Sequence, residues 1–528
     1  MKIYLKKFLE KDFKELGIKE GLNSEDVYRT FCKDVQYPVV GALINNKMAD
    51  MKATLKEGDQ VVLLDMRNVT AMHCYQRSLI FLFLKAASDV LGKDVEFKVC
   101  NPVNNGMHIR PVVENTDVLE MAEPIKEKMK ELISQDIPFE RVNERSGIYR
   151  LGDYEDYAYD CLLPSTGYIY AFNVMKYYYG YLIKYPRVDS PEGLPKNKDD
   201  YKLLEAFHQA DRWETLLGIQ YVEDLNRVIK EDKMGRLIQV SEAIHESNIV
   251  GIAKRIVEEK KRIILIAGPS SSGKTSFANR LAVQLQVNGL WPIAFSTDDY
   301  FIDRKDLIPD ENGQLDFESL EALDIELFNR DVNNLLAGKP VDIPTFNFIT
   351  GEKEYGKRII QLTENQPIII EGIHGLNRKL TEDIPDEQKF KIYISPLTGL
   401  NIDLHNSISP SDQRMLRRMV RDYKTRGKNA AITIDEWPKV RAGEDINIFP
   451  YINEADVFFN SVFVYGMSVL KKYAQPLLEK VPQNVPEYPE AARLLNILNL
   501  FETCKNDEII LNNSILREFI GGSIFFKG

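Results

Sequence analysis

The stretch from Ile263 to Leu285 brings together the residue types that can hold a phosphate group. An apolar run that starts at Ile263 leads into Gly268-Pro-Ser-Ser-Ser-Gly-Lys-Thr275, and apolar residues at helical spacing follow. The glycines allow successive backbone N–H groups to turn toward one anion, and the N-terminus of the following helix adds its dipole. Strand, loop and helix in this order predict a phosphate-binding loop that takes a nucleoside triphosphate.

The side chains of this loop indicate how ATP and Mg²⁺ would be held. Lys274 carries a mobile positive charge for the terminal phosphates, and the hydroxyl of Thr275 suits Mg²⁺. The residues that we predict to bind ATP here are Gly268, Ser270, Ser271, Ser272, Gly273, Lys274, Thr275 and Ser276.

Two carboxylates follow apolar runs further along the chain. Asp298 comes after Trp291–Ser296, and Glu371 comes directly after Ile368-Ile-Ile370. Ligands of open α/β sheets bind at the carboxyl ends of the strands, so both acids should lie beside the phosphates. Asp298 could then take a proton from an attacking hydroxyl or hold Mg²⁺, and Glu371 would act on the metal.

A third cluster consists of arginines spaced for one helix face, namely Arg414, Arg417, Arg418 and Arg421. Such a face could clamp phosphates and neutralise charge on a transferred group. A solvated basic face is the alternative. Gly427 and the residues after it fit a hinged lid that would exclude water from the site.

The ordered series of motifs between about residues 260 and 465 resembles the uridine kinase/phosphoribulokinase group of P-loop kinases, and within it the uridine–cytidine kinases. The matching segments are Ser296-Thr-Asp298-Asp-Tyr300, Phe317-Glu318-Ser-Leu-Glu-Ala-Leu-Asp324, Pro344-Thr-Phe346, Glu371-Gly-Ile373 and Arg417-Arg-Met-Val-Arg421-Asp-Tyr-Lys-Thr-Arg426-Gly427. The resemblance implies ATP-dependent phosphorylation of a nucleoside 5′-hydroxyl, with uridine or cytidine as the family-level substrate.

The same resemblance implies a role for each matching residue. Catalysis is assigned to Asp298 as the base together with Lys274 and Arg421, and further ATP contacts to Arg417 and Arg426. Substrate contacts are assigned to Asp298, Tyr300, Glu318, Phe346 and Arg421, and the Mg²⁺ site to Thr275, Asp298 and Glu371. The chain departs from the family where the base would be read, because it has Phe346 and Gly351 in place of a tyrosine and a histidine.

The N-terminal half resembles part of a different enzyme. Segments at 39–44 and 58–64 are similar to the TGS module of threonyl-tRNA synthetases, a small β-rich fold. Residues 152–164 are similar to the editing-type domain of those enzymes, whose relatives hold zinc with histidines and a cysteine. At those positions this chain has Tyr75, Leu79, Cys161 and Ser165, so the resemblance implies a scaffold that has lost the hydrolytic chemistry.

These observations predict an α/β fold in which a P-loop kinase domain, with a parallel sheet and helices on both faces, follows a β-grasp and an α+β domain. The expected domains are a TGS-like unit at 1–66, an editing-like domain at 67–200, a helical connector at 201–255, the kinase domain at 256–480 and a helical tail at 481–528. The polar, Pro/Gly-containing stretch 186–214 indicates a surface loop or linker.

Composition narrows the classes of partner and compartment. The formal charge of −11 argues against a general nucleic-acid binder, and the apolar run 79–84 stops at Lys85, too short to cross a membrane. Five cysteines without CxxC spacing, and no signal-peptide pattern in residues 1–10, favour a cytoplasmic protein. We expect a small nucleoside as substrate, and a homo-oligomer.

Two other functions remain open on the sequence. Transfer to a sugar phosphate or another small hydroxyl acceptor, as in phosphoribulokinases, would need extra basic residues in the acceptor pocket. A nucleotide-dependent, RNA-associated regulatory module would bind nucleotide without acceptor-dependent release of ADP.

Overall fold

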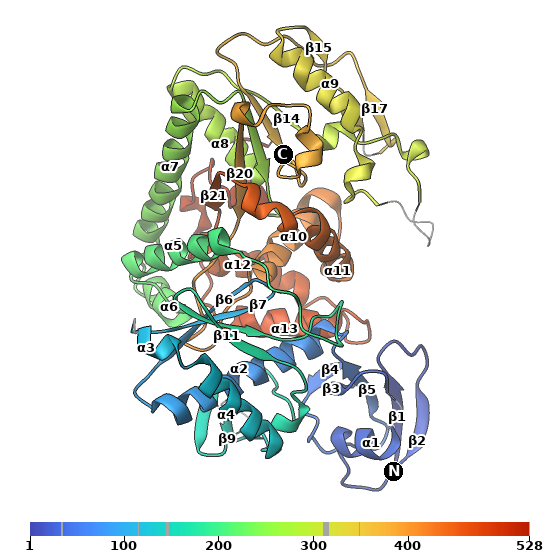
Figure 1. The fold of residues 1–528 in the computed structure, drawn as a ribbon. Helices are drawn as coiled ribbons and strands as arrows, with labels where there is room; N and C mark the ends of the chain where they lie inside the picture. The colour runs from blue at the N-terminus through green and yellow to red at the C-terminus, as the bar shows by residue number, and fades with distance from the viewer. Residues whose placement is uncertain (33–34, 114–115, 144–146, 310–315, 348, 527–528) are drawn as a thin grey trace.

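A parallel β-sheet organises the C-terminal α/β domain, which forms one end of the elongated molecule in Figure 1. The computed structural model describes residues 1–32, 35–113, 116–143, 147–309, 316–347 and 349–526. The order of the strands is β14-β19-β13-β20-β21, and each neighbouring pair is parallel. The strands are β13 (Ile263–Ala267), β14 (Ile293–Ser296), β19 (Ile368–Glu371), β20 (Lys389–Ser395) and β21 (Val457–Asn460).

Alternate residues of the central strand β13 enter different hydrophobic cores. Ile264 and Ile266 pack in the core that includes Phe277 and Leu281. Ile263 and Leu265 pack in the core that includes Phe328. Successive side chains of a strand point to opposite faces, so the apolar run that the sequence shows is covered on both sides. The expected P-loop fold with a parallel sheet and helices is confirmed for this domain.

Helices surround this sheet, and the chain continues past it into a tail. The helices are α8 (Lys274–Val287), α9 (Ile325–Leu336), α10 (Pro410–Arg426), α11 (Ala430–Asn447), α12 (Gly466–Leu478), α13 (Tyr488–Asn499) and α14 (Arg517–Ile520). Short strands β15 (Val341–Asp342), β16 (Thr345–Asn347), β17 (Glu352–Glu354) and β18 (Ile359–Ile360) follow α9. Helix α10 begins with Pro410 after the capping Ser409 and ends at Gly427, whose φ is 66°. Proline at the start and left-handed glycine after the end are the expected boundaries of a helix.

The N-terminal residues form a mixed sheet with strand order β2-β1-β5-β3-β4, in which β1 and β5 are parallel. Its elements are β1 (Lys2–Lys7), β2 (Lys14–Gly17), α1 (Ser24–Phe31), β3 (Val39–Ile44), β4 (Lys47–Ala49) and β5 (Gln60–Asp65). The small β-rich unit that the sequence predicts is therefore present. Its relation to the TGS module stays a prediction.

The next part of the chain packs helices α2 (Val69–Leu91) and α4 (Ala122–Ser134) beside an antiparallel sheet with the order β11-β12-β7-β6. The elements of this part are β6 (Phe97–Val103), β7 (Gly106–Pro111), α3 (Thr116–Leu119), β8 (Glu140–Arg141), β9 (Ile148–Leu151), β10 (Tyr154–Tyr157), β11 (Asn173–Tyr177) and β12 (Gly180–Lys184). At the positions compared with zinc ligands, the Tyr75 hydroxyl donates to the carbonyl of Ala171 at 2.7 Å. Burial raises the pKa of the Cys161 thiol to about 12, so this cysteine is a protonated thiol at neutral pH.

Helices α5 (Tyr201–Leu217), α6 (Val222–Lys230) and α7 (Met234–Glu258) connect the two halves. The predicted loop over 186–214 is wrong from residue 201 onward, where α5 begins. Leu204, Phe207 and Ala210 are buried at helical spacing within that polar sequence. A narrow apolar stripe was enough to make a helix once a packing surface was available.

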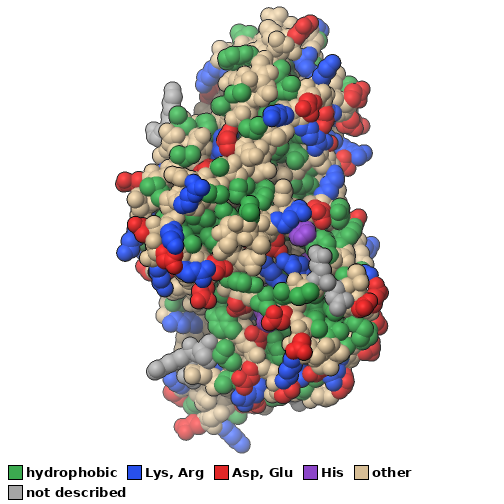
Figure 2. All heavy atoms as spheres, turned by 90° about the vertical axis from the view of Figure 1, so that its left-hand side faces the viewer, with side chains coloured by type: hydrophobic (Ala, Val, Ile, Leu, Met, Phe, Trp, Pro, Cys, Tyr) green, Lys and Arg blue, Asp and Glu red, His purple; other side chains and the backbone are tan. Residues whose placement is uncertain are grey.

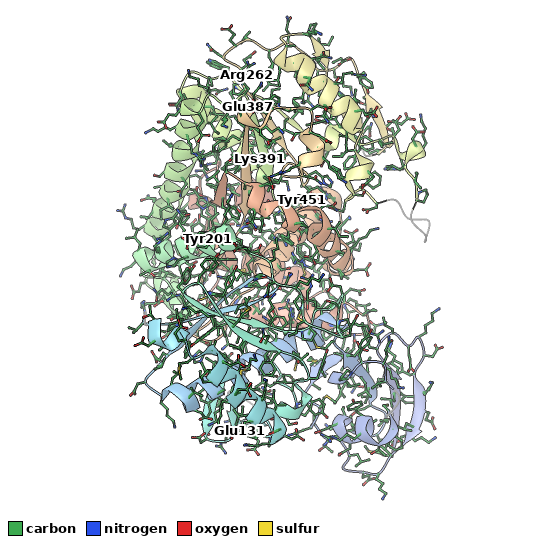
Figure 3. All side chains as sticks on the ribbon, in the orientation of Figure 1. Glu131, Tyr201, Arg262, Glu387, Lys391 and Tyr451 are labelled. Carbon is green, nitrogen blue, oxygen red and sulfur yellow. The ribbon has the colours of Figure 1, made fainter. Side chains whose placement is uncertain are left out.

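The two halves are joined by hydrogen bonds from backbone amides and from side chains to backbone carbonyls. The amide of Val99 donates to the carbonyl of Leu404, and Asn401 donates to the carbonyl of Val99 at 2.7 Å. Lys202 on α5 donates to the carbonyls of Asn453 and Ala455. Figure 3 labels Tyr201, the residue before Lys202, and Tyr451, two residues before Asn453.

Figure 2 shows one face of the molecule, where basic and acidic side chains are interspersed with apolar ones. Within the described part of the chain, no helix combines the length and the apolarity that a membrane span requires.

Candidate functional site

The loop after β13 lies at the carboxyl end of the parallel sheet. Gly268 leaves the strand so close to β20 that a Cβ there would lie 2.1 Å from the carbonyl oxygen of Ile394. Ser271 and Gly273 have left-handed backbone with φ of 61° and 92°, and α8 begins at Lys274. Only glycine fits at position 268, so the turn that aims backbone amides at an anion depends on Gly268.

The loop already satisfies part of its hydrogen-bonding capacity. The Nζ of Lys274 donates to the carbonyl of Gly268 at 3.0 Å. The hydroxyls of Ser271 and Ser272 are buried and have no hydrogen-bond partner among the described residues. Buried hydroxyls without partners are costly, and an anion in the loop would supply acceptors. These observations fit a bound phosphate group.

The register of the sheet brings the two predicted acids to the loop. Ser296 and Ile266 both pair with Glu371, so β14, β19 and β13 end at one level. An Oε of Glu371 accepts from the Thr275 hydroxyl at 2.9 Å. Asp298 lies in the turn Thr297–Tyr300 that follows β14. The charge of Lys274 acts on both carboxyl groups, so the three groups share one site.

The environment shifts the pKa of both acids upward. Burial raises the pKa of Glu371 to about 7, against the lowering effect of Lys274 and with a further raising effect from Asp298. Desolvation also raises the pKa of Asp298, although the residue is exposed on the surface of its turn. Carboxyl groups raised in this way are typical of sites where a cation or a proton is handled.

The same acids fit a magnesium ion. Among the described residues, no group of three or more acidic, His or Cys side chains is placed so that it alone could hold a metal ion, so the protein ligands would be few. Mg²⁺ usually keeps several waters and binds through one or two carboxylates plus substrate phosphates. Thr275, Glu371 and Asp298 supply a hydroxyl and two carboxylates of this kind.

The guanidinium groups of the α10 arginines are not all available to the loop, because several are paired with other residues. Arg414 forms a buried two-pronged ion pair with Glu444, at 2.5 and 2.8 Å. Arg418 donates to the Ser270 hydroxyl at 2.9 Å. The guanidinium of Arg417 is fully buried, donates to the carbonyl of Ser461, and lies 5.1 Å from the ring centroid of Phe519. Thus Arg418 reaches the loop directly, whereas Arg417 is covered.

A buried acid near the C-terminal end of α10 forms ion pairs with three arginines of the same helix. Asp422, with no exposed surface, pairs with Arg418 at 3.4 Å, Arg421 at 2.8 Å and Arg426 at 3.6 Å. Burial, together with the neighbouring arginines, lowers the pKa of the Arg426 guanidinium. Asp422 therefore positions the two arginines that the family resemblance assigns to transfer and to ATP.

The residues assigned to the acceptor lie at different depths. Glu318 is half-buried against Gly443 of α11; burial and Glu444 raise its pKa, while Arg418 and Lys274 lower it. Tyr300 is instead fully buried, with its ring 5.2 Å from Phe328, and supports the core below the turn. Phe346 is buried with its ring 5.5 Å from Phe301. Glu318, like Asp298, thus shares the electrostatic environment of the loop, whereas Tyr300 lies in the core.

Sequence reasoning missed two acids that contact the loop. An Oε of Glu444 on α11 accepts from the backbone N–H of Ser270 at 3.0 Å. An Oε of Glu518 on α14 accepts from the N–H of Ser276 at 3.2 Å and from its hydroxyl at 2.7 Å. Although burial opposes ionisation, Arg414 holds the pKa of Glu444 below its ordinary value. These acids lie 174 and 242 residues from their partners, so no local spacing signals them.

A buried histidine, His374, lies three residues after Glu371. His374 is almost fully buried, and burial lowers its pKa to about 4 against the opposing charge of Glu321. The imidazole is therefore neutral at physiological pH.

The fold and this arrangement define a P-loop phosphotransferase domain of the α/β class. The phosphoribulokinase/uridine kinase family matches residues 263–467. A uridine kinase of Staphylococcus aureus (strain JH9) is 31% identical over 196 residues, which are 37% of this chain and 85% of that protein. A structure described as a possible uridine kinase from Bacillus stearothermophilus is 22% identical over 40% of this chain and 98% of its own, with a TM-score of 0.28.

The chain belongs to the phosphoribulokinase/uridine kinase family. This membership supports a kinase activity toward a small substrate. Residues 1–262 lie outside the family match, so the editing-like assignment, like the TGS-like one, stays a prediction.

Proposed function

We propose that this protein transfers the terminal phosphoryl group of ATP to the 5′-hydroxyl of a nucleoside, with uridine or cytidine as the first candidates. The observation that carries the proposal is the joint placement of Lys274, Thr275, Asp298 and Glu371 at one end of the parallel sheet. The S. aureus relative is named a uridine kinase, which motivates the choice of nucleoside.

The chemistry assigns one task to each group. The acceptor oxygen forms the bond to phosphorus while the bond to ADP breaks, and Asp298 takes the hydroxyl proton. Its raised pKa makes Asp298 a better proton acceptor than an ordinary aspartate. Lys274 and Arg421 stabilise charge on the transferred group. When bound, Mg²⁺ would neutralise phosphate charge, held by Thr275, Glu371 and Asp298.

An acceptor screen tests the proposal. Release of ADP would be measured with Mg-ATP and a panel of pyrimidine and purine nucleosides, ribose phosphates and other small hydroxyl acceptors. We expect release that depends on a nucleoside. Release with a sugar phosphate alone would indicate the phosphoribulokinase-like alternative, and binding of ATP without any acceptor-dependent release would indicate the regulatory module.

The variant Asp298→Asn identifies the base. The amide keeps the size of the side chain but cannot take the proton, so turnover should fall by a factor of about 10² to 10⁴, the usual share of a general base. The affinity for ATP, measured by calorimetry, should stay nearly unchanged. Turnover close to that of the unaltered protein would remove Asp298 from its role.

The compartment and the partners are also proposals. We propose that the protein acts in the cytoplasm without nucleic-acid or membrane partners, on the basis of its composition and charge, and we keep the homo-oligomer as an expectation.

A further inference from the structure

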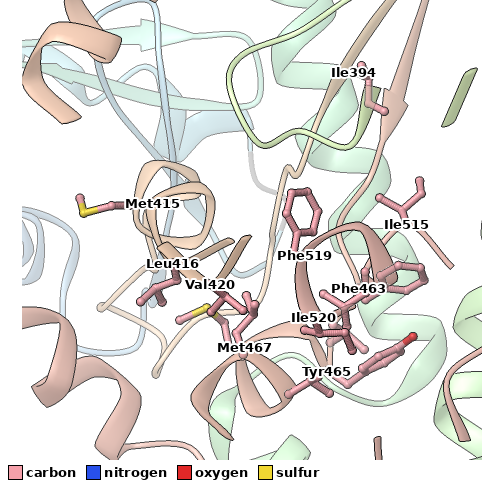
Figure 4. Close-up of a cluster of buried hydrophobic side chains, with 14 of the residues drawn as sticks. Ile394, Met415, Leu416, Val420, Phe463, Tyr465, Met467, Ile515, Phe519 and Ile520 are labelled. Carbon is pink, nitrogen blue, oxygen red and sulfur yellow. The ribbon is translucent and has the colours of Figure 1, made fainter. Parts of the chain in front are cut away.

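The C-terminal tail contacts the phosphate-binding loop directly, although no motif assigns it a role. Helix α14 follows α13 after an extended segment and lies against α10. Ile515, Leu516, Phe519 and Ile520 are buried, and Figure 4 shows Ile515, Phe519 and Ile520 among core residues such as Phe463 and Tyr465. The tail is therefore a packed part of the domain.

One carboxylate of the tail occupies an anion position of the loop. Ser276 is the third residue of α8, and its N–H belongs to the first turn, where helix amides have no partner inside the helix. An Oε of Glu518 accepts hydrogen bonds from this N–H and from the hydroxyl of the same residue. These are donors that a phosphate group would use at this helix end, because backbone amides here cradle the phosphates nearer the nucleoside while Lys274 reaches the outer ones.

Apolar side chains of the tail cover the neighbouring surface. Ile515 lies so close to the loop that a Cβ on Gly273 would come within 2.4 Å of its Cγ2 atom. The ring of Phe519 lies over the guanidinium of Arg417. An arginine face is a common support for a flat aromatic group. The neighbouring Glu518 and Phe519 thus place an anion on Ser276 and a ring on Arg417.

Other contacts hold the tail in this position. Lys424 of α10 donates to the carbonyl of Ile520. Arg517 donates to the carbonyls of Asp507 and Ile510, at 2.9 and 2.8 Å. These bonds are made by the backbone and by Arg517 itself, so a change at Glu518 leaves them in place.

We propose that the tail is autoinhibitory: Glu518 and Phe519 occupy the places of an inner phosphate and of the base of the nucleotide, and ATP binds only after they leave. The carboxylate and a phosphate cannot share the N–H of Ser276, and two negative charges there would repel each other. A tail seated on nine of ten molecules raises the apparent Kd for ATP about tenfold. The inference rests on the proposed function only in taking this loop as the nucleotide site.

The test compares nucleotide affinity in full-length variants. Glu518→Ala and Glu518→Gln should lower the Kd for ATP, measured by calorimetry, by up to about tenfold for a tail seated on nine of ten molecules. Phe519→Ala should act in the same direction. Glu508→Gln is the matched control, because it removes an exposed carboxylate from the same tail without contact to the loop. Equal or weaker binding in both Glu518 variants would overturn the proposal.

Hydrogen exchange of the unaltered protein gives a second measurement that needs no variant. Saturating ATP should remove amide protection from residues 514–521, whereas retained protection in the ATP complex would overturn the proposal. Failure of the proposed function looks different. ATP would then bind and displace the tail, but no acceptor would cause release of ADP.

Discussion

Glu371 shows how a single position can couple metal binding to protons. Its pKa is raised by burial from 4.5 to about 7, so the carboxyl group is largely protonated in the free protein below that pH. A raised acid pKa means that the folded state holds the proton more tightly than the unfolded chain. Between about pH 4.5 and 7, ionisation of Glu371 therefore costs stability as the pH rises. A cation bound at Thr275 and Glu371 would reverse that preference.

We predict that binding of Mg-ATP at pH 6.5 releases a proton from Glu371, and that the affinity for the metal rises with pH up to about 7. Calorimetric titrations in buffers of different ionisation enthalpy measure the released proton. Glu371→Gln has no proton to release and serves as the reference. The same release from both proteins would assign it to another group.

At the scale of elements, the C-terminal part of α10 holds three of its arginines through one buried acid. Asp422 pairs with Arg418, Arg421 and Arg426 just before the helix ends at Gly427. Residues in a single network do not act independently, so the orientation of all three side chains depends on this carboxylate. The element thus places positive charge before any substrate arrives.

We predict that Asp422→Asn lowers kcat about tenfold or more, because arginines without their anchor lose the geometry that transfer requires. The free energy of unfolding should fall by about 2 kcal/mol, as buried charge partners are lost. Steady-state kinetics and urea unfolding check these values. Asp435→Asn, on the exposed side of α11, is the control. Equal kcat in the two variants would mean that Asp422 has no positioning role.

At the scale of the whole molecule, the N-terminal half and the kinase domain are tied by a loop that follows β20. Asn401 is buried; its side chain donates to Val99, and its own carbonyl accepts from Val222. The loop therefore links β6, the connector helices and the sheet that carries the site. We expect the two halves to unfold together.

We predict that Asn401→Ala costs about 1 to 3 kcal/mol of stability, since it leaves a carbonyl at the interface without its donor. Urea unfolding followed by circular dichroism measures the loss. Asn288→Ala removes a comparable hydrogen bond, from a side-chain amide to a backbone carbonyl, at the exposed end of α8 and should cost less. A larger loss in the control would show that the loop does not join the halves.

Local sequence was sufficient for the loop, for the strands that flank it and for the two strand-end acids. A phosphate-binding loop is built from consecutive residues, and the period of an apolar run reports the burial of a strand. The same reasoning placed Asp298 and Glu371 together, because parallel strands end at one edge. The same reasoning extended the predicted loop at 186–214 too far, into α5. The many polar residues there made the few apolar residues at helical spacing difficult to recognise.

What the sequence by itself determined about this protein is the strand–loop–helix motif of residues 263–275 and its α/β setting. Only the tertiary structure decided that Glu444 and Glu518 contact the loop and that Arg414 and Arg417 are occupied. It also decided that Tyr300 lies in the core. The reason is physical: contacts between residues separated by tens to hundreds of positions depend on how elements pack. Packing is set by the whole chain and leaves no local pattern of residue types.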